Sequence, residues 1–177
     1  PLGSYDGLVV WITGGGSGIG RALALELAQQ GAKVAVSGRR VDRLQEVVEE
    51  LAATGRPALA VACDVADEAS CKAAVATILE AFGQLDVAIA NAGFGVAGKV
   101  EEMPDEAWRR QFDVNVIGVL NTVRAAMPSL RARQGRMVLV SSVAAFVYPR
   151  KNAAYSASKA AVRAIGEALS AELGSSG

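Results

Sequence analysis

The chain has 177 residues, 51% of them hydrophobic, and its 18 basic side chains balance its 18 acidic ones. This length suits one domain with a sizeable core, and the even charge without a basic block argues against nucleic acid or an anionic membrane as a partner. No apolar run reaches transmembrane length, and the lack of histidine excludes His-based triads and His-ligated metal sites, so we expect no bound metal.

Strand-like and helix-like segments alternate along the chain. Apolar runs predict five short strands, at residues 7–13, 33–37, 57–62, 85–90 and 136–141. Helical periodicity and glycine stops predict helices at residues 18–30, 41–54, 67–82, 104–133 and 152–173, with Pro128 kinking or ending the fourth helix early. This alternation predicts an α/β fold, a Rossmann-type doubly wound parallel sheet in three layers (α/β/α) with strand order 3-2-1-4-5.

The stretch from Thr13 to Gly20, TGGGSGIG, joins the first strand to the first helix. Glycine lets the backbone turn sharply and approach a pyrophosphate closely, and the free N–H groups at the helix start then face the anion. The spacing is not the usual G-x-G-x-x-G. Its place between strand and helix nevertheless favours a dinucleotide loop over the alternative, a bare glycine turn.

The second strand ends in Ser37-Gly38-Arg39-Arg40, without the carboxylate that holds the adenosine 2′-hydroxyl in NAD sites. Two guanidinium groups can instead accept a 2′-phosphate. This end of the strand therefore favours NADP over NAD. The alternative is a solvated basic pair that starts the next helix.

Tyr155 and Lys159 lie four residues apart on the last predicted helix and so share one face. A nearby ammonium stabilises a phenolate and lowers a tyrosine pKa from its usual value near 10, so such a pair can transfer protons without histidine. The same spacing is common on exposed helices, which is the alternative here. Asn115 is a poor helix former in mid-helix, and its alternative to a functional role is a polar contact across a helix interface.

In combination these motifs resemble the classical short-chain dehydrogenase/reductase family over about residues 7–173. The resemblance is carried by TGGGSGIG, Asp64-Val65, Ala90-Asn91-Ala92-Gly93, Asn115, Ser142 thirteen residues before Tyr155, and Tyr155-xxx-Lys159.

The resemblance implies an NADP-dependent oxidoreductase that reduces a carbonyl or oxidises a secondary alcohol by hydride transfer. Tyr155 would be the acid or base, and Lys159 would assist it and hold the nicotinamide ribose. Ser142 would bind the substrate oxygen, and Asn115 would hold a water of a proton relay. The residues expected at the cofactor are Gly14, Ser17, Gly18, Ile19 and Gly20 at the pyrophosphate, Arg39 and Arg40 at the 2′-phosphate, Asp64 and Val65 at adenine, Asn91, Ala92 and Gly93 at the adenosine and nicotinamide ribose region, and Tyr155 with Lys159.

The chain departs from the family at its end. Family members continue from the last helix through two more strands with a mobile substrate lid between them, and none of that is present. A second hypothesis is therefore a truncated, inactive fragment that binds dinucleotide or only self-associates. Residues 1–4 read as the remnant of a purification tag and residues 174–177 as a linker or tail, which leaves residues 5–173 as the domain.

The resemblance also implies a homo-oligomer, a dimer or tetramer, formed through the helices at residues 105–133 and 152–173. The substrate is expected to be an apolar small molecule, because Phe94 and residues 146–148 are apolar or aromatic. Cys63 and Cys71 have neither metal-type nor redox-type spacing and are predicted to be buried thiols in a reducing cytoplasm.

Overall fold

A computed structural model of the chain describes residues 5–174. Residues 1–4, the predicted tag remnant, and residues 175–177 of the predicted tail (residues 174–177) lie outside the described residues. The elements follow one another as β1 (Val9–Thr13), α1 (Gly18–Gln29), β2 (Lys33–Gly38), α2 (Val41–Ala52), β3 (Ala58–Ala62), α3 (Glu68–Phe82), β4 (Val87–Ala90), α4 (Asp105–Phe112), a π-helical turn (Asp113–Ile117), α5 (Gly118–Arg133), β5 (Arg136–Leu139), a 3-10 turn (Val143–Ala145) and α6 (Ala153–Leu173).

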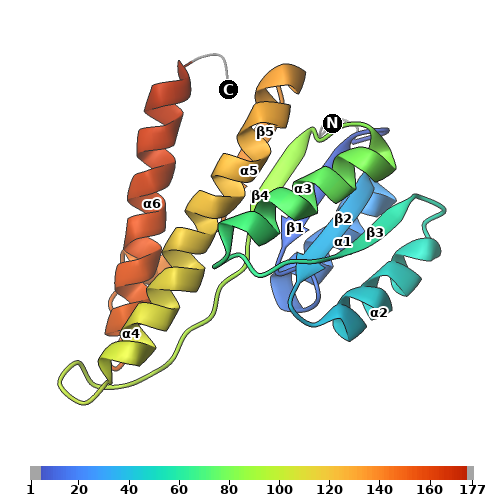
Figure 1. Cartoon of the computed structure of the whole chain (residues 1–177). Coiled ribbons are helices and arrows are strands. Elements are labelled where there is room, and N and C mark those ends of the chain that lie inside the picture. Colours follow the sequence, from blue (N-terminus) through green and yellow to red (C-terminus); the bar gives the residue numbers. More distant parts are fainter. Residues whose placement is uncertain (1–4, 175–177) are drawn as a thin grey trace.

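All five strands are parallel and lie in the order β3-β2-β1-β4-β5, which confirms the predicted sheet. The first strand of the chain is thus the central strand of the sheet (Figure 1). Strands β2 and β3 are added on one side of β1, and strands β4 and β5 on the other. The carboxyl ends of β1 and β4, where the order of strands reverses, therefore open a crevice in which ligands of such sheets bind.

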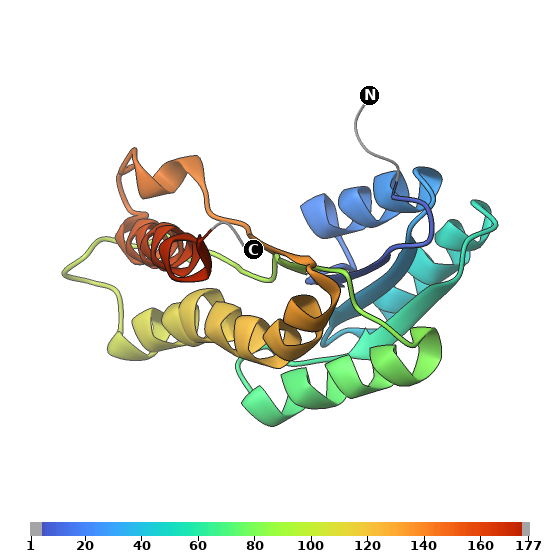
Figure 2. The same ribbon diagram turned by 90° about the horizontal axis from the view of Figure 1, so that it is seen from above.

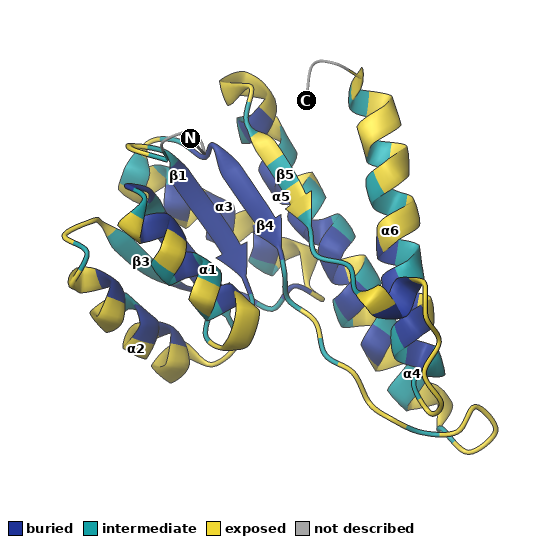
Figure 3. Ribbon diagram, turned by 180° about the vertical axis from the view of Figure 1, so that it is seen from behind, coloured by how far each residue is buried: buried dark blue, intermediate teal, exposed yellow. Residues whose placement is uncertain are grey.

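Successive side chains of β1 point to opposite faces of the sheet, and each set enters its own core. Val9 and Trp11 pack toward α3 and α5, whereas Val10 and Ile12 pack toward α1 and α2. Figure 2 shows α1 on one side of the sheet and α3 with α5 on the other. Burial on both faces explains why the central strands are continuous apolar runs (Figure 3).

The predicted helix over residues 104–133 is three segments, because a π-helical turn separates α4 from α5. Pro128 lies inside α5, which continues to Arg133, so the expectation that this proline could end the helix early is wrong. The side of Pro128 is exposed to solvent. The carbonyl group of Arg124, one turn earlier, loses its helical N–H partner there, and Arg124 is also exposed to solvent.

α6 stands beyond the β5 edge of the sheet, alongside α4 and the π-helical turn (Figures 1 and 3). Between α5, β5 and α6 lies a groove of about 600 Å³, lined in part by Met127, Met137, Leu139 and Leu169. Within residues 5–174 no strand pairs with the outer edge of β5, and no helix is long and apolar enough to cross a membrane.

One buried carboxylate, that of Asp86, bonds to segments that are far apart in the sequence, at the start of β1, just before β4 and at the end of α5. Asp86, 5% exposed, accepts hydrogen bonds from Val9 N (2.8 Å), Gln84 Nε2 (2.7 Å) and Arg133 Nε (3.0 Å). Burial alone would raise the pKa of Asp86, but the bonds from Val9, Arg133 and Gln84 outweigh burial and hold this pKa below its usual value.

An Asp86→Asn variant is expected to be less stable by about 2 kcal/mol at pH 7, since an amide cannot accept these bonds equally well. The native pKa of Asp86 is below that of the unfolded chain, so its stabilisation is complete above about pH 4 and is lost as the pH falls through the native pKa. Urea unfolding at several pH values should therefore show the deficit shrinking below about pH 4. Asp42→Asn, on the exposed side of α2, is the control, and a deficit independent of pH would contradict the assignment.

Candidate functional site

The loop between β1 and α1 needs glycine for two different reasons. Gly14 and Gly18 have φ of +65° and +54°, values that side chains with a Cβ rarely adopt. Gly20 instead permits a close approach, because a Cβ there would lie 2.4 Å from Gly14 O and 2.7 Å from Asn91 Nδ2. The loop can therefore bring its backbone N–H groups close to a bound anion at the start of α1.

Thr13 and Asn91 join this loop to the carboxyl end of β4. Asn91 Nδ2 donates to Thr13 O (2.9 Å) and Gly14 O (3.3 Å), while Thr13 Oγ1 accepts from the backbone N–H groups of Asn91 and Ala92 (both 3.1 Å). The two strands at which the topology reverses are thus fixed to one another at the crevice.

A cleft of about 810 Å³ opens along this end of the sheet. Most of the residues predicted to bind the cofactor line it. They are Gly14, Ser17, Gly18, Ile19, Arg39, Arg40, Asp64, Val65, Asn91, Ala92, Gly93, Tyr155 and Lys159. Three predicted residues do not line the cleft: Gly20 lies behind the loop, Asn115 is fully buried, and Ser142 is half-buried beside it.

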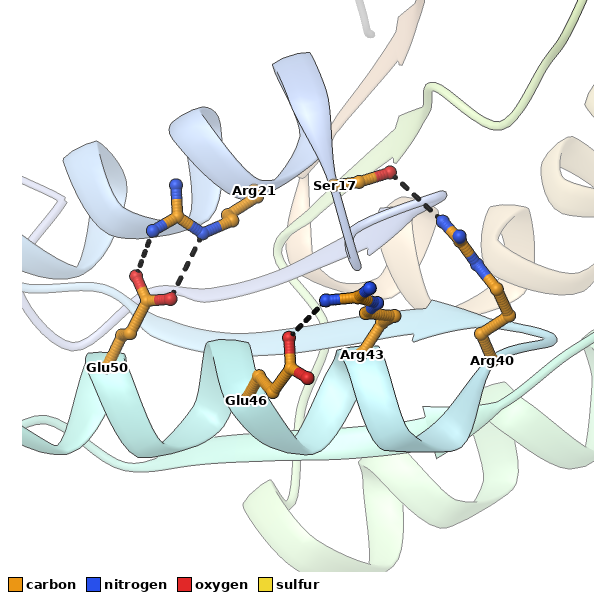
Figure 4. Close-up of polar contacts among 6 residues, drawn as sticks. All are labelled: Ser17, Arg21, Arg40, Arg43, Glu46 and Glu50. Atoms are coloured by element: carbon orange, nitrogen blue, oxygen red, sulfur yellow. Dashed lines mark hydrogen bonds and ion pairs between the residues drawn. The ribbon is translucent and has the colours of Figure 1, made fainter.

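Arginines gather where the cleft meets the start of α2 (Figure 4). Arg40 reaches across to Ser17 and donates to its Oγ at 3.3 Å. Arg43 also lines the cleft, with its guanidinium 2.9 Å from Glu46, whereas exposed Arg39 has no carboxylate within 4.0 Å among residues 5–174. Arg43 was not predicted as a site residue, although its place one turn beyond Arg39 at the start of a helix was a usable signal.

Tyr155 and Lys159 face the cleft from the first turns of α6. Lys159 Nζ lies 5.9 Å from the centroid of the Tyr155 ring and donates to Val140 O at 2.8 Å. Lys159 is only 4% exposed, and this burial lowers the pKa of its ammonium group. A cationic donor is therefore held next to a phenol at the wall of the cleft, and α6 is a rigid support for both.

The two serines after β5 differ in their contacts. Ser142 caps the 3-10 turn, where its Oγ accepts from Ala144 N at 3.1 Å. Ser141 lines the cleft, and its Oγ donates to Lys159 O at 2.9 Å. The structure thus brings Ser141 to the cleft surface, and the expected contact of Ser142 with a substrate oxygen stays a prediction.

Asn115 occupies the π-helical turn between α4 and α5 and is fully buried. Its Nδ2 donates to Phe94 O (2.8 Å) and Ser158 Oγ (3.0 Å), and its Oδ1 accepts from Phe94 N (3.0 Å). One side chain therefore joins the segment after β4 to α6. π-helical turns are frequent at functional sites, and here the turn aims an amide behind the Gly93–Lys159 region of the cleft.

Within residues 5–174 no group of three or more Cys, Asp or Glu side chains is placed to hold a metal ion. The site consists instead of a glycine loop, arginines, and a phenol beside an ammonium.

Comparison with known proteins identifies the arrangement. The family model for short chain dehydrogenase matches residues 8–177. An uncharacterized oxidoreductase of Staphylococcus epidermidis is 34% identical over 170 residues, 96% of this chain and 73% of that protein, and one of Listeria monocytogenes is 36% identical over 165 residues, 93% and 66%.

Solved structures agree with the sequence relatives. A short chain dehydrogenase/reductase from Burkholderia phymatum in complex with NAD superposes with a TM-score of 0.93 at 35% identity, over 97% of this chain and 62% of that one. An alcohol dehydrogenase from Thermococcus sibiricus, complexed with 5-hydroxy-NADP, gives 0.90 at 32%, over 93% and 71%. With this fold, and with a family match over nearly all of its length, the chain belongs to the short-chain dehydrogenase family of NAD(P)-dependent oxidoreductases.

Proposed function

We propose that the protein is an NADP-dependent oxidoreductase that reduces a carbonyl group or oxidises a secondary alcohol. The observation that carries this proposal is the single cleft of about 810 Å³ whose walls hold the glycine loop, Arg39 with Arg40, and the Tyr155–Lys159 pair. These three parts correspond to the pyrophosphate, the adenosine end and the reacting end of one extended dinucleotide.

The residues present fit such a cofactor. A Cβ at Gly20 would collide with Gly14 O, so the loop is shaped around close backbone packing that leaves N–H groups free at the start of α1. Gly14, Ser17, Gly18 and Ile19 would hold the pyrophosphate. The remaining subsites follow the cleft: Asp64 and Val65 at adenine, Asn91, Ala92 and Gly93 at the riboses, and Lys159 at the nicotinamide ribose.

A bound nicotinamide would supply or accept the hydride. Tyr155 donates a proton to the carbonyl oxygen in reduction and removes one from the hydroxyl in oxidation. The Lys159 ammonium, held near the phenol by burial and by Val140 O, favours the phenolate electrostatically. Ser142 donates to the substrate oxygen once its hydroxyl turns toward the cleft, and Asn115 positions a relay water behind Lys159.

The choice of NADP rests on the guanidinium groups at the end of β2. Known structures of the family include one complexed with NAD and one with 5-hydroxy-NADP, so the fold accommodates both. Arg39 has no acidic partner among residues 5–174 and lines the cleft, and it is therefore free to pair with a 2′-phosphate.

Titrations with NADPH and NADH test this choice. We expect NADPH to bind at least about tenfold more tightly, and Arg39→Ala to weaken NADPH by a similar factor while leaving NADH unchanged, since a charge-assisted hydrogen bond contributes roughly 1.5–3 kcal/mol. Arg56→Ala is the matched control, because Arg56 pairs with Asp6 (2.9 Å) away from the cleft. A preference for NADH would overturn the proposal for NADP.

The substrate, assembly and compartment are also proposals. Exposed apolar residues near the reacting end, Val143, Phe146 and Val147, favour an apolar carbonyl or alcohol substrate. We propose a dimer or tetramer formed through residues 105–133 and 152–173. A molar mass of a monomer, measured by light scattering at high protein concentration, would contradict it. The two free thiols fit a cytoplasmic location, and recovery of the protein in a secreted fraction would exclude it.

One observation favours a second candidate function, a chain that binds dinucleotide without turnover. The β5 edge and the apolar groove beside α6 are open within residues 5–174, so one side of the reacting end of the cleft lacks a neighbouring strand. Oxidation of NADPH with any member of a panel of aldehydes and ketones would exclude this candidate. Binding without turnover across the panel would favour it.

A further inference from the structure

The two cysteines lie together at the adenosine end of the cleft, although eight residues separate them in the chain. Cys63 follows β3, lines the cleft, and is anchored to the sheet by its backbone N–H, which donates to Gly38 O at 3.0 Å. Cys71 is fully buried in the first turn of α3. The two Sγ atoms are 3.9 Å apart.

The loop between them carries Asp64 and Val65, the pair proposed to flank adenine. Asp64 N donates to Ser70 Oγ at 3.0 Å, and Val65 O accepts from Asn121 Nδ2 at 2.9 Å and from Cys71 Sγ at 3.8 Å. The Cys71 thiol is therefore one of the groups in contact with this wall of the cleft.

We propose that Cys63 and Cys71 form a modification site, a thiol pair that a hydroperoxide entering through the cleft converts reversibly to a disulfide, and that bound dinucleotide protects. This inference rests on the proposed cofactor site for the protection, but not for the oxidation itself. It goes beyond the hydride-transfer function because it adds a second chemistry at the adenosine end.

The step balances in atoms and electrons. The Cys63 sulfur attacks the O–O bond of the hydroperoxide, which leaves Cys63 as a sulfenic acid and releases an alcohol, or water from hydrogen peroxide. The Cys71 sulfur then attacks the sulfenic sulfur, an S–S bond forms, and water departs with the proton of the Cys71 thiol. The peroxide gains two electrons and the two thiols lose two.

The order of the two steps follows from the surroundings of each sulfur. Cys63 is 3% exposed and lines the cleft, whereas Cys71 has no exposed surface and lies behind it, although both belong to the core that contains Val75 and Ile78. The hydrogen bond between the two sulfur atoms lowers the pKa of the Cys63 thiol, and the same pairing together with burial raises the pKa of Cys71. Cys63 is thus the attacking sulfur and Cys71 the resolving one.

Closure of the disulfide changes the cleft. An S–S bond is about 2.05 Å long, so the sulfur atoms must approach by nearly 2 Å from their present separation. Closure breaks the contact of the Cys71 thiol with Val65 O, so we expect the loop with Asp64 and Val65 to shift. We expect the disulfide to weaken NADP⁺ binding about tenfold, a typical coupling between linked sites.

Thermodynamic linkage makes this coupling reciprocal. If the reduced protein binds NADP⁺ about tenfold more tightly, saturating NADP⁺ raises the reduction potential of the thiol pair by about 30 mV. Bound dinucleotide also covers the side of the cleft from which a peroxide reaches Cys63, so oxidation becomes slower as well as less favourable.

The test exposes the reduced protein to hydrogen peroxide with and without saturating NADP⁺, followed by alkylation and peptide mass spectrometry without reductant. We expect a Cys63–Cys71 cross-link that dithiothreitol removes and that forms about tenfold more slowly when NADP⁺ is present at about ten times its Kd, where roughly a tenth of the protein is unliganded. Cys71→Ser should stop at a sulfenic acid on Cys63, trapped by dimedone, and Cys63→Ser should leave Cys71 unmodified. The comparison with and without NADP⁺ uses the wild-type protein, so it is valid even if neither variant folds.

The outcomes separate this inference from the proposed function. Absence of the cross-link in cofactor-free protein under excess peroxide overturns the thiol site, whatever the protein binds. Equal cross-linking rates with and without NADP⁺, in protein that a titration shows to be saturated, overturn the protection. Failure of the reduced protein to bind either dinucleotide overturns the cofactor proposal instead. In that case the presence or absence of the cross-link still shows whether the two thiols form a disulfide.

Discussion

A Tyr155→Phe variant is expected to lose turnover by a factor of about a thousand or more, the range in which a positioned acid or base accelerates proton transfer. The change removes only the hydroxyl and keeps the ring. The ring packs closely against Gly95, where an added Cβ would lie only 3.1 Å from it. Dinucleotide affinity should therefore stay within about threefold. The rate of NADPH oxidation at saturating cofactor measures turnover, and a fluorescence titration measures dinucleotide affinity.

Tyr5→Phe is the matched control, since Tyr5 packs against the core near β1 and takes no part in the cleft. It should leave turnover unchanged. Turnover retained in Tyr155→Phe would remove Tyr155 from the acid–base role. Loss of both turnover and binding would point to a collapsed cleft, and circular dichroism of the variant distinguishes that case.

The second large effect is expected in stability, from Asn115→Ala. The substitution leaves the N–H and C=O groups of Phe94 without their partner and removes a bond to Ser158 Oγ. With roughly 1 kcal/mol for each bond and more for groups left buried and unpaired, the free energy of unfolding should fall by about 3 kcal/mol. Urea unfolding followed by circular dichroism measures it.

Asn121→Ala is the control for the cavity that such a truncation leaves. Asn121 is also buried, lies on α5, and makes one hydrogen bond, to Val65 O. The free energy of unfolding should fall less in Asn121→Ala than in Asn115→Ala, by about 1 kcal/mol for each additional hydrogen bond that Asn115 makes. Equal losses in the two variants would mean that the bonds to Phe94 contribute nothing to stability.

Much of the fold followed from local patterns. Apolar runs and glycine stops located all five strands and most helices. Their alternation predicted a doubly wound parallel sheet, and the usual order of a Rossmann sheet then supplied the order 3-2-1-4-5, which is confirmed. The glycine loop was placed correctly because strand, turn and helix are adjacent in sequence. The π-helical turn was not predicted, since it depends on the pairing of Asn115 with Phe94, which lies 21 residues earlier.

Side-chain direction limited what could be predicted of the site. Spacing placed Tyr155 and Lys159 on one face of a helix, and both do line the cleft. The same reasoning could not tell Ser141 from Ser142, because neighbouring residues after a strand point to different sides and a 3-10 turn decides which. Spacing also gave no sign of the contact between Cys63 and Cys71, although both were expected to be buried; the turn from β3 into α3 makes this contact.

The hydrogen bonds of Asp86 have a consequence for how the chain folds. β1 is made first during synthesis, yet it is the central strand, and the carboxylate that accepts from Val9 N arrives 77 residues later. Arg133, the third partner, follows 47 residues after Asp86. At synthesis rates of about 5–20 residues per second, β1 waits several seconds for β4, so the nascent chain exposes a strand that is fully buried in the folded protein. Non-local strand pairing of this kind forms slowly, so residues 9–13 are a stretch of the nascent chain in which a chaperone could prevent aggregation.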